Sequence, residues 1–169
     1  MGYTIIAFDE VSFYLAPVYR RAWHLKGTKP TAPFFWSTKK VKLFGALING
    51  NKIFYKYYDS HNSTNYRVFL FDLIQTLDAS KKYVFLLDNA SYHKSVKIRE
   101  FMHDYENIII EYFPPYSPEL NPIEICWKIT RANVTNNVYY TKIEDMQSKI
   151  NNFLDSHNFM LNLSNYLCR

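Results

Sequence analysis

The sequence predicts an α/β fold in which a five-stranded mixed sheet is flanked by helices. Three observations lead to this fold class. Short apolar runs alternate with amphipathic helical patterns after residue 60, which is typical of strands joined by helical crossovers. Nearer the N-terminus, Asn49-Gly50 is a strong hairpin signal between two strand-like runs. Apolar residues make up 48% of the chain and aromatic residues 18%, which is ample for a packed core.

The first part of the chain is expected to form three strands, an arm and a helix. Residues 3–9 are a short apolar run that ends in an acid, as in a buried strand. Residues 16–40 mix basic, aromatic and proline residues, which favours a loop or arm. Residues 41–50 and 52–58 fit the two strands of a hairpin with a type I′ turn. In residues 62–77 apolar side chains recur at helical spacing behind an Asn-Ser-Thr run that favours a helix start.

The second part is expected to alternate between strands and helices. Residues 81–88 are apolar almost throughout, so we expect a strand buried on both faces. Apolar spacing predicts a helix over 98–105, and residues 107–113 read as a fifth strand. A third helix is expected at about 121–134, beyond a proline-rich segment. The fourth, over 141–154, is expected to open with a capping box between Thr141 and Glu144.

The order of these elements limits the topology of the sheet. Three hairpin-linked strands are followed by two strands that are reached through helices. Right-handed crossovers would make the fourth and fifth strands parallel to the first. The economical sheet order is therefore 3-2-1-4-5, which places strands one and four side by side.

Bulk properties narrow the function classes. The formal charge of +5 permits a polyanionic partner without requiring one. Cys126 and Cys168 have neither metal-site spacing nor a disulfide framework, so we expect reduced thiols. The N-terminus has no signal-peptide pattern, and the sequence has no apolar run of 18 residues. A cytoplasmic protein is expected, associated with the nucleoid when bound to DNA.

Two acids follow neighbouring strands of the predicted sheet. Asp9 is expected at the carboxyl end of strand one and Asp88 at that of strand four. Parallel neighbours end at one edge about 4.8 Å apart, so the two carboxylates would repel each other unless a cation lay between them. Mg²⁺ takes such oxygen ligands. Alternatively, Asp88 caps a turn and Asp9 is a strand-end turn residue.

A third acid, Glu124, follows four prolines in nine residues, from Pro114 to Pro122. If Asn121 is the N-cap, then Pro122 is the first helical residue and Glu124 is the third. That position suits a structural capping role. It also restricts the carboxylate, and a metal ligand needs such rigidity. The two roles are compatible.

Several stretches of the sequence match a known family. VFLLDNASYHKS, the 35 residues between Asp88 and Glu124, and YFPPYSPELNPIEICWK resemble the catalytic domain of mariner-like transposases and their insertion-sequence relatives. FDE and RRAWHLKGTKP fit the same family, and the match covers roughly residues 4–135. The resemblance implies a ribonuclease H-like fold, with Asp9, Asp88 and Glu124 as catalytic acids and metal ligands. It also implies two Mg²⁺ or Mn²⁺ ions, cleavage of DNA and strand transfer during transposition.

The resemblance and the local composition suggest further site residues. Three residues are candidates for hydrogen bonds that orient the metal ligands, namely Glu10, Asn89 and Glu119. Solvated surface positions are the simpler alternative. His93 is expected to position other groups or to contact DNA. Basic and aromatic residues of the arm are candidates for contacts with phosphates and bases, against the alternative of a solvated charged loop. The DNA-contact candidates are Arg20, Arg21, Trp23, Lys26, Lys29, Lys39, Lys40 and His93.

Residues 1–169 are expected to form a single DDE catalytic domain. Met1 lies two residues before the first strand, so no helix-turn-helix module is expected in front of it. We expect a catalytic fragment, the product of a separate reading frame, or a remnant. The expected partners are double-stranded DNA, a second copy in the active complex and a separately encoded helix-turn-helix protein. Residues 136–169 would pack on the sheet or on a partner copy.

Two other functions remain open from the sequence. One is a ribonuclease H-type nuclease that cuts RNA in hybrids. The other is a decayed or domesticated domain that binds DNA without catalysing a reaction.

Overall fold

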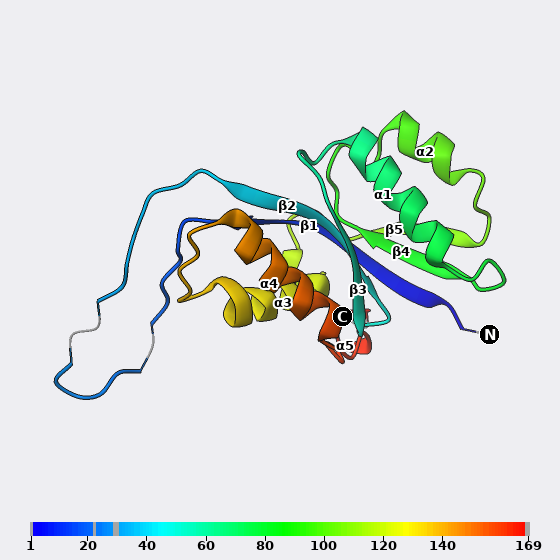
Figure 1. Ribbon diagram of the computed structural model, residues 1–169. Helices are drawn as coiled ribbons and strands as arrows, with labels where there is room; N and C mark the ends of the chain where they lie inside the picture. Colours follow the sequence, from blue (N-terminus) through cyan, green and yellow to red (C-terminus); the bar gives the residue numbers. More distant parts are fainter. Residues whose placement is uncertain (1, 22, 29–30, 168–169) are drawn as a thin grey trace.

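The computed structural model describes residues 2–21, 23–28 and 31–167, and its centre is one mixed sheet (Figure 1). The strand order is β3-β2-β1-β4-β5, as the sequence predicts. β2 pairs antiparallel with β1 and β3, whereas β4 pairs parallel with β1 and β5. The strands are β1 (Thr4–Tyr14), β2 (Lys40–Ile48), β3 (Lys52–Tyr57), β4 (Tyr83–Leu87) and β5 (Ile108–Tyr112).

The first strand is longer than expected. It does not end at Asp9 but continues to Tyr14, because β2 stays paired with it as far as the Tyr14–Lys40 pair. β4 accompanies β1 only from Thr4 to Ala7. The two parallel strands therefore do not end together as expected. β4 ends close to Asp9, whereas β1 continues beyond it.

Two pairs of helices cover the two faces of the sheet (Figure 1). α1 (Ser63–Thr76) and α2 (Val96–Met102) lie on one face, and α3 (Ile123–Thr130) and α4 (Ile143–Ser156) lie on the other. The shorter elements are the 3₁₀ turn η1 (Pro118–Leu120), the π turn η2 (Arg131–Thr135) and α5 (Ser164–Leu167). Within the described ranges, no helix is long and apolar enough to cross a membrane.

Helix termini differ in places from the sequence patterns. The side chain of Asn62 caps α1 by accepting the Asn65 N–H at 2.9 Å, as its type favours. α2 stops at Met102, three residues before the expected end. The capping box predicted for α4 is wrong: Lys142 occupies the N-cap and makes no side-chain capping bond.

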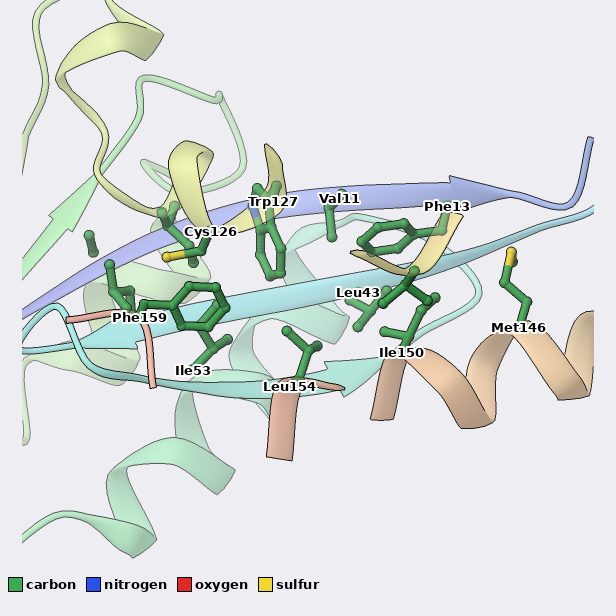
Figure 2. Packing of buried hydrophobic residues seen from close by; sticks show 14 of the residues in the cluster. Val11, Phe13, Leu43, Ile53, Cys126, Trp127, Met146, Ile150, Leu154 and Phe159 are labelled. Carbon is green, nitrogen blue, oxygen red and sulfur yellow. The ribbon is translucent and has the colours of Figure 1, made fainter. Parts of the chain in front are cut away.

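The sheet separates two apolar layers. The layer under α1 and α2 includes Phe8, Phe69 and Phe85. The layer under α3 and α4, drawn in Figure 2, contains Trp127 beside β1 and β2 together with Met146, Ile150 and Leu154 of α4. The C-terminal residues thus pack on the sheet of their own chain, which is the first of the two expected arrangements. Alternation along β1 sends successive side chains to opposite layers.

The hairpin turn organises the C-terminal segment. Asn49 and Gly50 both have positive φ, at 48° and 74°, as a type I′ turn requires. The Phe159 N–H donates to the Asn51 carbonyl at 2.9 Å, and the Leu161 N–H donates to the Gly50 carbonyl at 2.8 Å. The segment after α4 is therefore held against the far end of β2 and β3.

The described residues between β1 and β2, which are 15–21, 23–28 and 31–39, lie in a long arm that extends away from the sheet (Figure 1). Its base is tied to the segment after η2. The Asn137 N–H donates to the Val18 carbonyl at 3.0 Å, and the Arg20 N–H donates to the Asn137 side-chain oxygen at 2.7 Å. The rings of Phe35 and Tyr139 meet edge-to-face with centroids 5.4 Å apart. The expected arm is confirmed as a segment with a fixed base.

Candidate active site

Three acids from separate elements line one cleft of about 410 Å³. Asp9 comes from β1, Asp88 follows β4, and Glu124 lies in the first turn of α3. In the parallel register Ala7 faces Leu86, so two residues further along both strands Asp9 comes alongside Asp88 on the same face. The predicted meeting of the two acids follows from this register, although β1 does not end there.

The proline-rich segment forms the wall of the cleft. The Phe113 N–H donates to the Leu87 carbonyl at 2.9 Å, which ties the exit of β5 to the end of β4. Pro114 to Pro118 then line the cleft. Within this run Tyr116 adopts a φ of 58°, which is rare for a bulky residue, and its side chain is fully exposed. A conformation of this kind, held between prolines at a cleft, is typical of functional sites.

The start of α3 is fixed to β1 by Asn121. Its buried side-chain amide donates to the Phe8 carbonyl at 2.8 Å. The expected start of the helix is shifted by one residue: Asn121 is extended, Pro122 is the N-cap without a side-chain capping bond, and α3 begins at Ile123, so Glu124 is its second residue. Glu124 follows at the cleft, and its carboxylate has no hydrogen-bond partner among the described residues.

Asp9 is a partly buried carboxylate with an incomplete set of partners. The indole Nε1–H of Trp127 donates to Asp9 Oδ2 at 3.0 Å. Burial raises the pKa of Asp9 well above its usual value, and the negative charges of Glu124 and Glu10 raise it further. The ionised form of Asp9 is therefore disfavoured unless a cation enters the cleft.

Asp88 has the opposite electrostatic environment. It accepts the Ala90 N–H at 2.9 Å and lies 2.8 Å from Nδ1 of His93. The hydrogen bond from His93 is the main reason that the pKa of Asp88 is lowered. Asp88 is thus held as a carboxylate by groups of its own loop.

His93 links Asp88 to Glu10 across the end of β4. Its Nε2 lies 3.0 Å from Glu10 Oε1, which also accepts the Tyr92 hydroxyl. Burial acts to lower the pKa of His93, but the hydrogen bonds to Asp88 and Glu10 outweigh it and raise the pKa to about 9. An imidazolium between two carboxylates follows from this geometry at neutral pH.

The structure separates the supporting candidates. His93 is 1% exposed and both its ring nitrogens face carboxylates, which favours the first of its two expected roles, the positioning of other groups. Glu10 lies behind His93, which fits the expected supporting role. Asn89 lines the cleft and donates to the Phe113 carbonyl at 2.5 Å. Glu119 is exposed and does not line the cleft, which favours the surface alternative.

The basic candidates of the arm lie apart from the acids. The side chain of Trp23 is fully exposed. Each basic DNA-contact candidate among the described residues is exposed as well. The exposed basic residues are Arg20, Arg21, Lys26 and Lys39 of the arm and Lys40, which is the first residue of β2 and not, as expected, part of the arm; Lys29 lies outside the described residues.

Sequence reasoning missed Trp127 and the anchoring role of Asn121. A signal was present, because Asn121, Glu124 and Trp127 recur at intervals of three and so share one side of a helix. Tyr116 was also missed. Its position between prolines is the sequence feature that could have drawn attention to it.

The cleft contains the type of ligand atom that a hard divalent cation requires. These atoms belong to three carboxylates, which are the ligands that Mg²⁺ and Mn²⁺ prefer. The charges of Glu124 and Glu10 act against ionisation of Asp9, and a bound cation would offset them. In the described part of the chain, however, no three acid, His or Cys side chains are already gathered closely enough to hold a metal ion. Metal binding would require the acids to close on the ion.

Comparison with known proteins places the chain in a family. A family model described as DDE superfamily endonuclease matches residues 4–147. The insertion element IS630 uncharacterized 39 kDa protein of Shigella sonnei is 26% identical over 149 residues, which are 88% of this chain and 43% of that protein. The chain therefore spans less than half the length of this relative.

Solved structures share the fold. The Mos1 transposase paired-end complex with left transposon end matches with a TM-score of 0.75 at 16% identity, covering 96% of this chain and 51% of that one. The mariner Mos1 paired end complex with Mg matches with a TM-score of 0.71 at 19% identity, covering 89% and 47%. With the observed strand order, these matches show the ribonuclease H-like fold.

Proposed function

The chain belongs to the DDE superfamily endonucleases, and on this premise we propose that residues 1–169 are the catalytic domain of an insertion-sequence transposase. It would cut DNA at the ends of the element and join those ends to target DNA. The observation that carries the proposal is the convergence of Asp9, Asp88 and Glu124 on one cleft from three elements. The IS630 relative and the Mos1 fold support the same function.

We propose that the three carboxylates hold two Mg²⁺ or Mn²⁺ ions. Two divalent ions would activate the attacking hydroxyl or water and stabilise the leaving oxygen of a phosphodiester. Asp88 is already ionised and oriented by His93, so it provides a fixed ligand. Asp9 would ionise as the cation enters, and Glu124, held at the cleft by the first turn of α3, would complete the set of carboxylates. The Mos1 complex with Mg supports this choice of metal.

The cleft itself would select and orient the DNA backbone. Its wall is rigid, because prolines limit the conformations from Pro114 to Pro118. The exposed ring of Tyr116 on this wall is suited to stacking on a base near the scissile phosphate. Orienting the phosphate in line with the attacking oxygen is the main task left to the protein.

A direct test is a cleavage assay with the purified chain. We expect supercoiled plasmid DNA to be nicked in Mg²⁺ or Mn²⁺ and to stay intact in EDTA, with little sequence preference. An RNA–DNA hybrid should be a poor substrate. Cleavage of the hybrid alone would favour the ribonuclease H-type alternative. Cleavage of neither substrate, in a chain that binds DNA, would favour the non-enzymatic one.

We propose that the arm binds DNA through its exposed basic residues. Changing Arg20 and Arg21 together to Ala should weaken duplex binding and reduce the slope of log K against log salt by about 0.9 for each phosphate that the arm no longer neutralises. Fluorescence anisotropy at several salt concentrations measures both quantities. Lys97→Ala, an exposed lysine of α2, is the matched control. Equal salt slopes in all three proteins would contradict the assignment.

The active assembly is proposed to contain two copies of the chain, because an element has two ends to be cut. A separately encoded helix-turn-helix protein is proposed to read the end sequences. The Mos1 paired-end complex supports an assembly on DNA ends.

A further inference from the structure

Trp127 makes a contact that packing alone does not explain. It is 1% exposed and fills the layer between α3 and the sheet, where its ring meets Phe13 edge-to-face (Figure 2). Packing requires only that the side chain there be large and apolar. The indole adds one donor, and that donor lies 3.0 Å from Oδ2 of Asp9, at the edge of the cleft.

The neighbouring strand β2 leaves room for the Trp127 ring. Gly45 of β2 is the cross-strand partner of Asp9. A Cβ at Gly45 would lie 2.5 Å from one carbon of the Trp127 ring and 3.3 Å from the end of Ile123. A mid-strand glycine often marks the close approach of another group. Here the absent side chain lets the indole lie against β2 and reach Asp9.

The chemistry of the donor also matters. An indole N–H is neutral, so it can orient a carboxylate without neutralising it. A lysine or arginine in the same place would satisfy the charge and compete with a metal ion. The neutral donor fixes the ligand and leaves its charge for the cation.

We propose that Trp127 is a positioning residue that orients Asp9 for metal binding, and that the absence of a side chain at Gly45 leaves the space that the Trp127 ring occupies. The inference rests on the proposed function, since it takes Asp9 as a metal ligand. It adds a partner for that ligand on the side of the sheet opposite to His93. Asp9 and Asp88 are then each oriented by one buried ring, Trp127 from α3 and His93 from the loop before α2.

Nuclear magnetic resonance can observe this donor directly. The chain has three tryptophans, and the side chains of Trp23 and Trp36 are 102% and 82% exposed, so their indole N–H signals serve as internal references. We expect the Trp127 signal alone to be protected from solvent exchange, to move on titration with Mg²⁺, and to shift in Asp9→Asn. A Trp127 signal that stays unchanged while Mg²⁺ binds would overturn the inference.

The second measurement is the affinity for Mn²⁺, followed by electron paramagnetic resonance without DNA. Trp127→Phe keeps a ring and removes the donor, and Gly45→Ala keeps the donor and displaces the ring. Each should weaken Mn²⁺ binding by about 10–100-fold, which is typical when a partner of a metal ligand is removed. Met146→Leu, a change on α4 in the same apolar layer, is the packing control and should bind Mn²⁺ as the wild type does.

The outcomes separate two failures. If the wild type binds no Mn²⁺, the proposed function fails, and this inference fails with it. If the wild type binds Mn²⁺ and folded Trp127→Phe binds it equally well, only the positioning role is wrong. Thermal melting of each variant identifies loss of fold. Should Trp127→Phe not fold, Gly45→Ala and the resonance measurement decide the question.

Discussion

Glu124→Gln is expected to abolish metal-dependent DNA cleavage while leaving the fold intact. The substitution keeps the size of the side chain and removes its charge. The Glu124 carboxylate has no hydrogen-bond partner in the described ranges, so the change should disturb little of the structure. Removing a metal ligand takes away several kcal/mol of transition-state stabilisation. About 4 kcal/mol corresponds to a fall in rate of about 10³-fold, which plasmid nicking assays can measure.

The matched control for this change lies five residues earlier. Glu119→Gln alters an exposed acid of the same proline-rich segment that does not line the cleft. Its nicking rate should equal that of the wild type within about twofold, because exposed substitutions away from a site have small effects. An active Glu124→Gln protein, or equal losses in both variants, would remove Glu124 from the catalytic set.

Asp9→Asn is expected to inactivate the protein and, at neutral pH without metal, to stabilise it. The pKa of Asp9 is raised above its usual value mainly by burial, so folding favours the protonated form. Its stabilising contribution is therefore complete below about pH 4 and is lost as pH rises through the raised pKa. Asparagine has no charge to bury and retains an oxygen that can accept the Trp127 N–H.

Thermal melting in EDTA from pH 4 to pH 8 tests this expectation. The melting temperature of Asp9→Asn should match that of the wild type near pH 4 and exceed it increasingly toward pH 7, by about 2–4 °C for each kcal/mol. Saturating Mn²⁺ should close the gap by stabilising the wild type alone. Asp104→Asn, at a highly exposed position, should show neither effect. A lower melting temperature for Asp9→Asn at pH 7 would contradict the electrostatic account.

Much of the fold is predictable because local patterns and chain connectivity agree. The Asn49-Gly50 turn determines the hairpin, and right-handed crossovers then leave one economical sheet order. The meeting of Asp9 and Asp88 follows from that order. The place of Glu124 at the cleft was predictable from its prolines, because their effect on the backbone is local and therefore visible in the sequence.

The remaining features depend on contacts between distant residues. The end of β1 could not be predicted, because its length depends on pairing with β2 beyond the arm. His93 lies in a polar stretch that reads as an exposed loop, and its burial follows from Glu10, 83 positions away. Trp127 reads as an ordinary core residue until Gly45 and Asp9 are seen beside it. In each case the decisive partner is remote in sequence.

The opposite orientations of Asp9 and Glu10 limit how this chain can change in length during evolution. Asp9 lines the cleft and accepts a hydrogen bond from Trp127, whereas Glu10 contacts His93 on the other side of the sheet. Insertions within the arm would lengthen a loop and leave this arrangement intact. One residue inserted between Thr4 and Asp9 would turn both side chains to the opposite faces of the sheet, so that Asp9 would leave the cleft and Glu10 would leave His93. We therefore expect homologues to vary in length after Tyr14 and to be free of insertions before it.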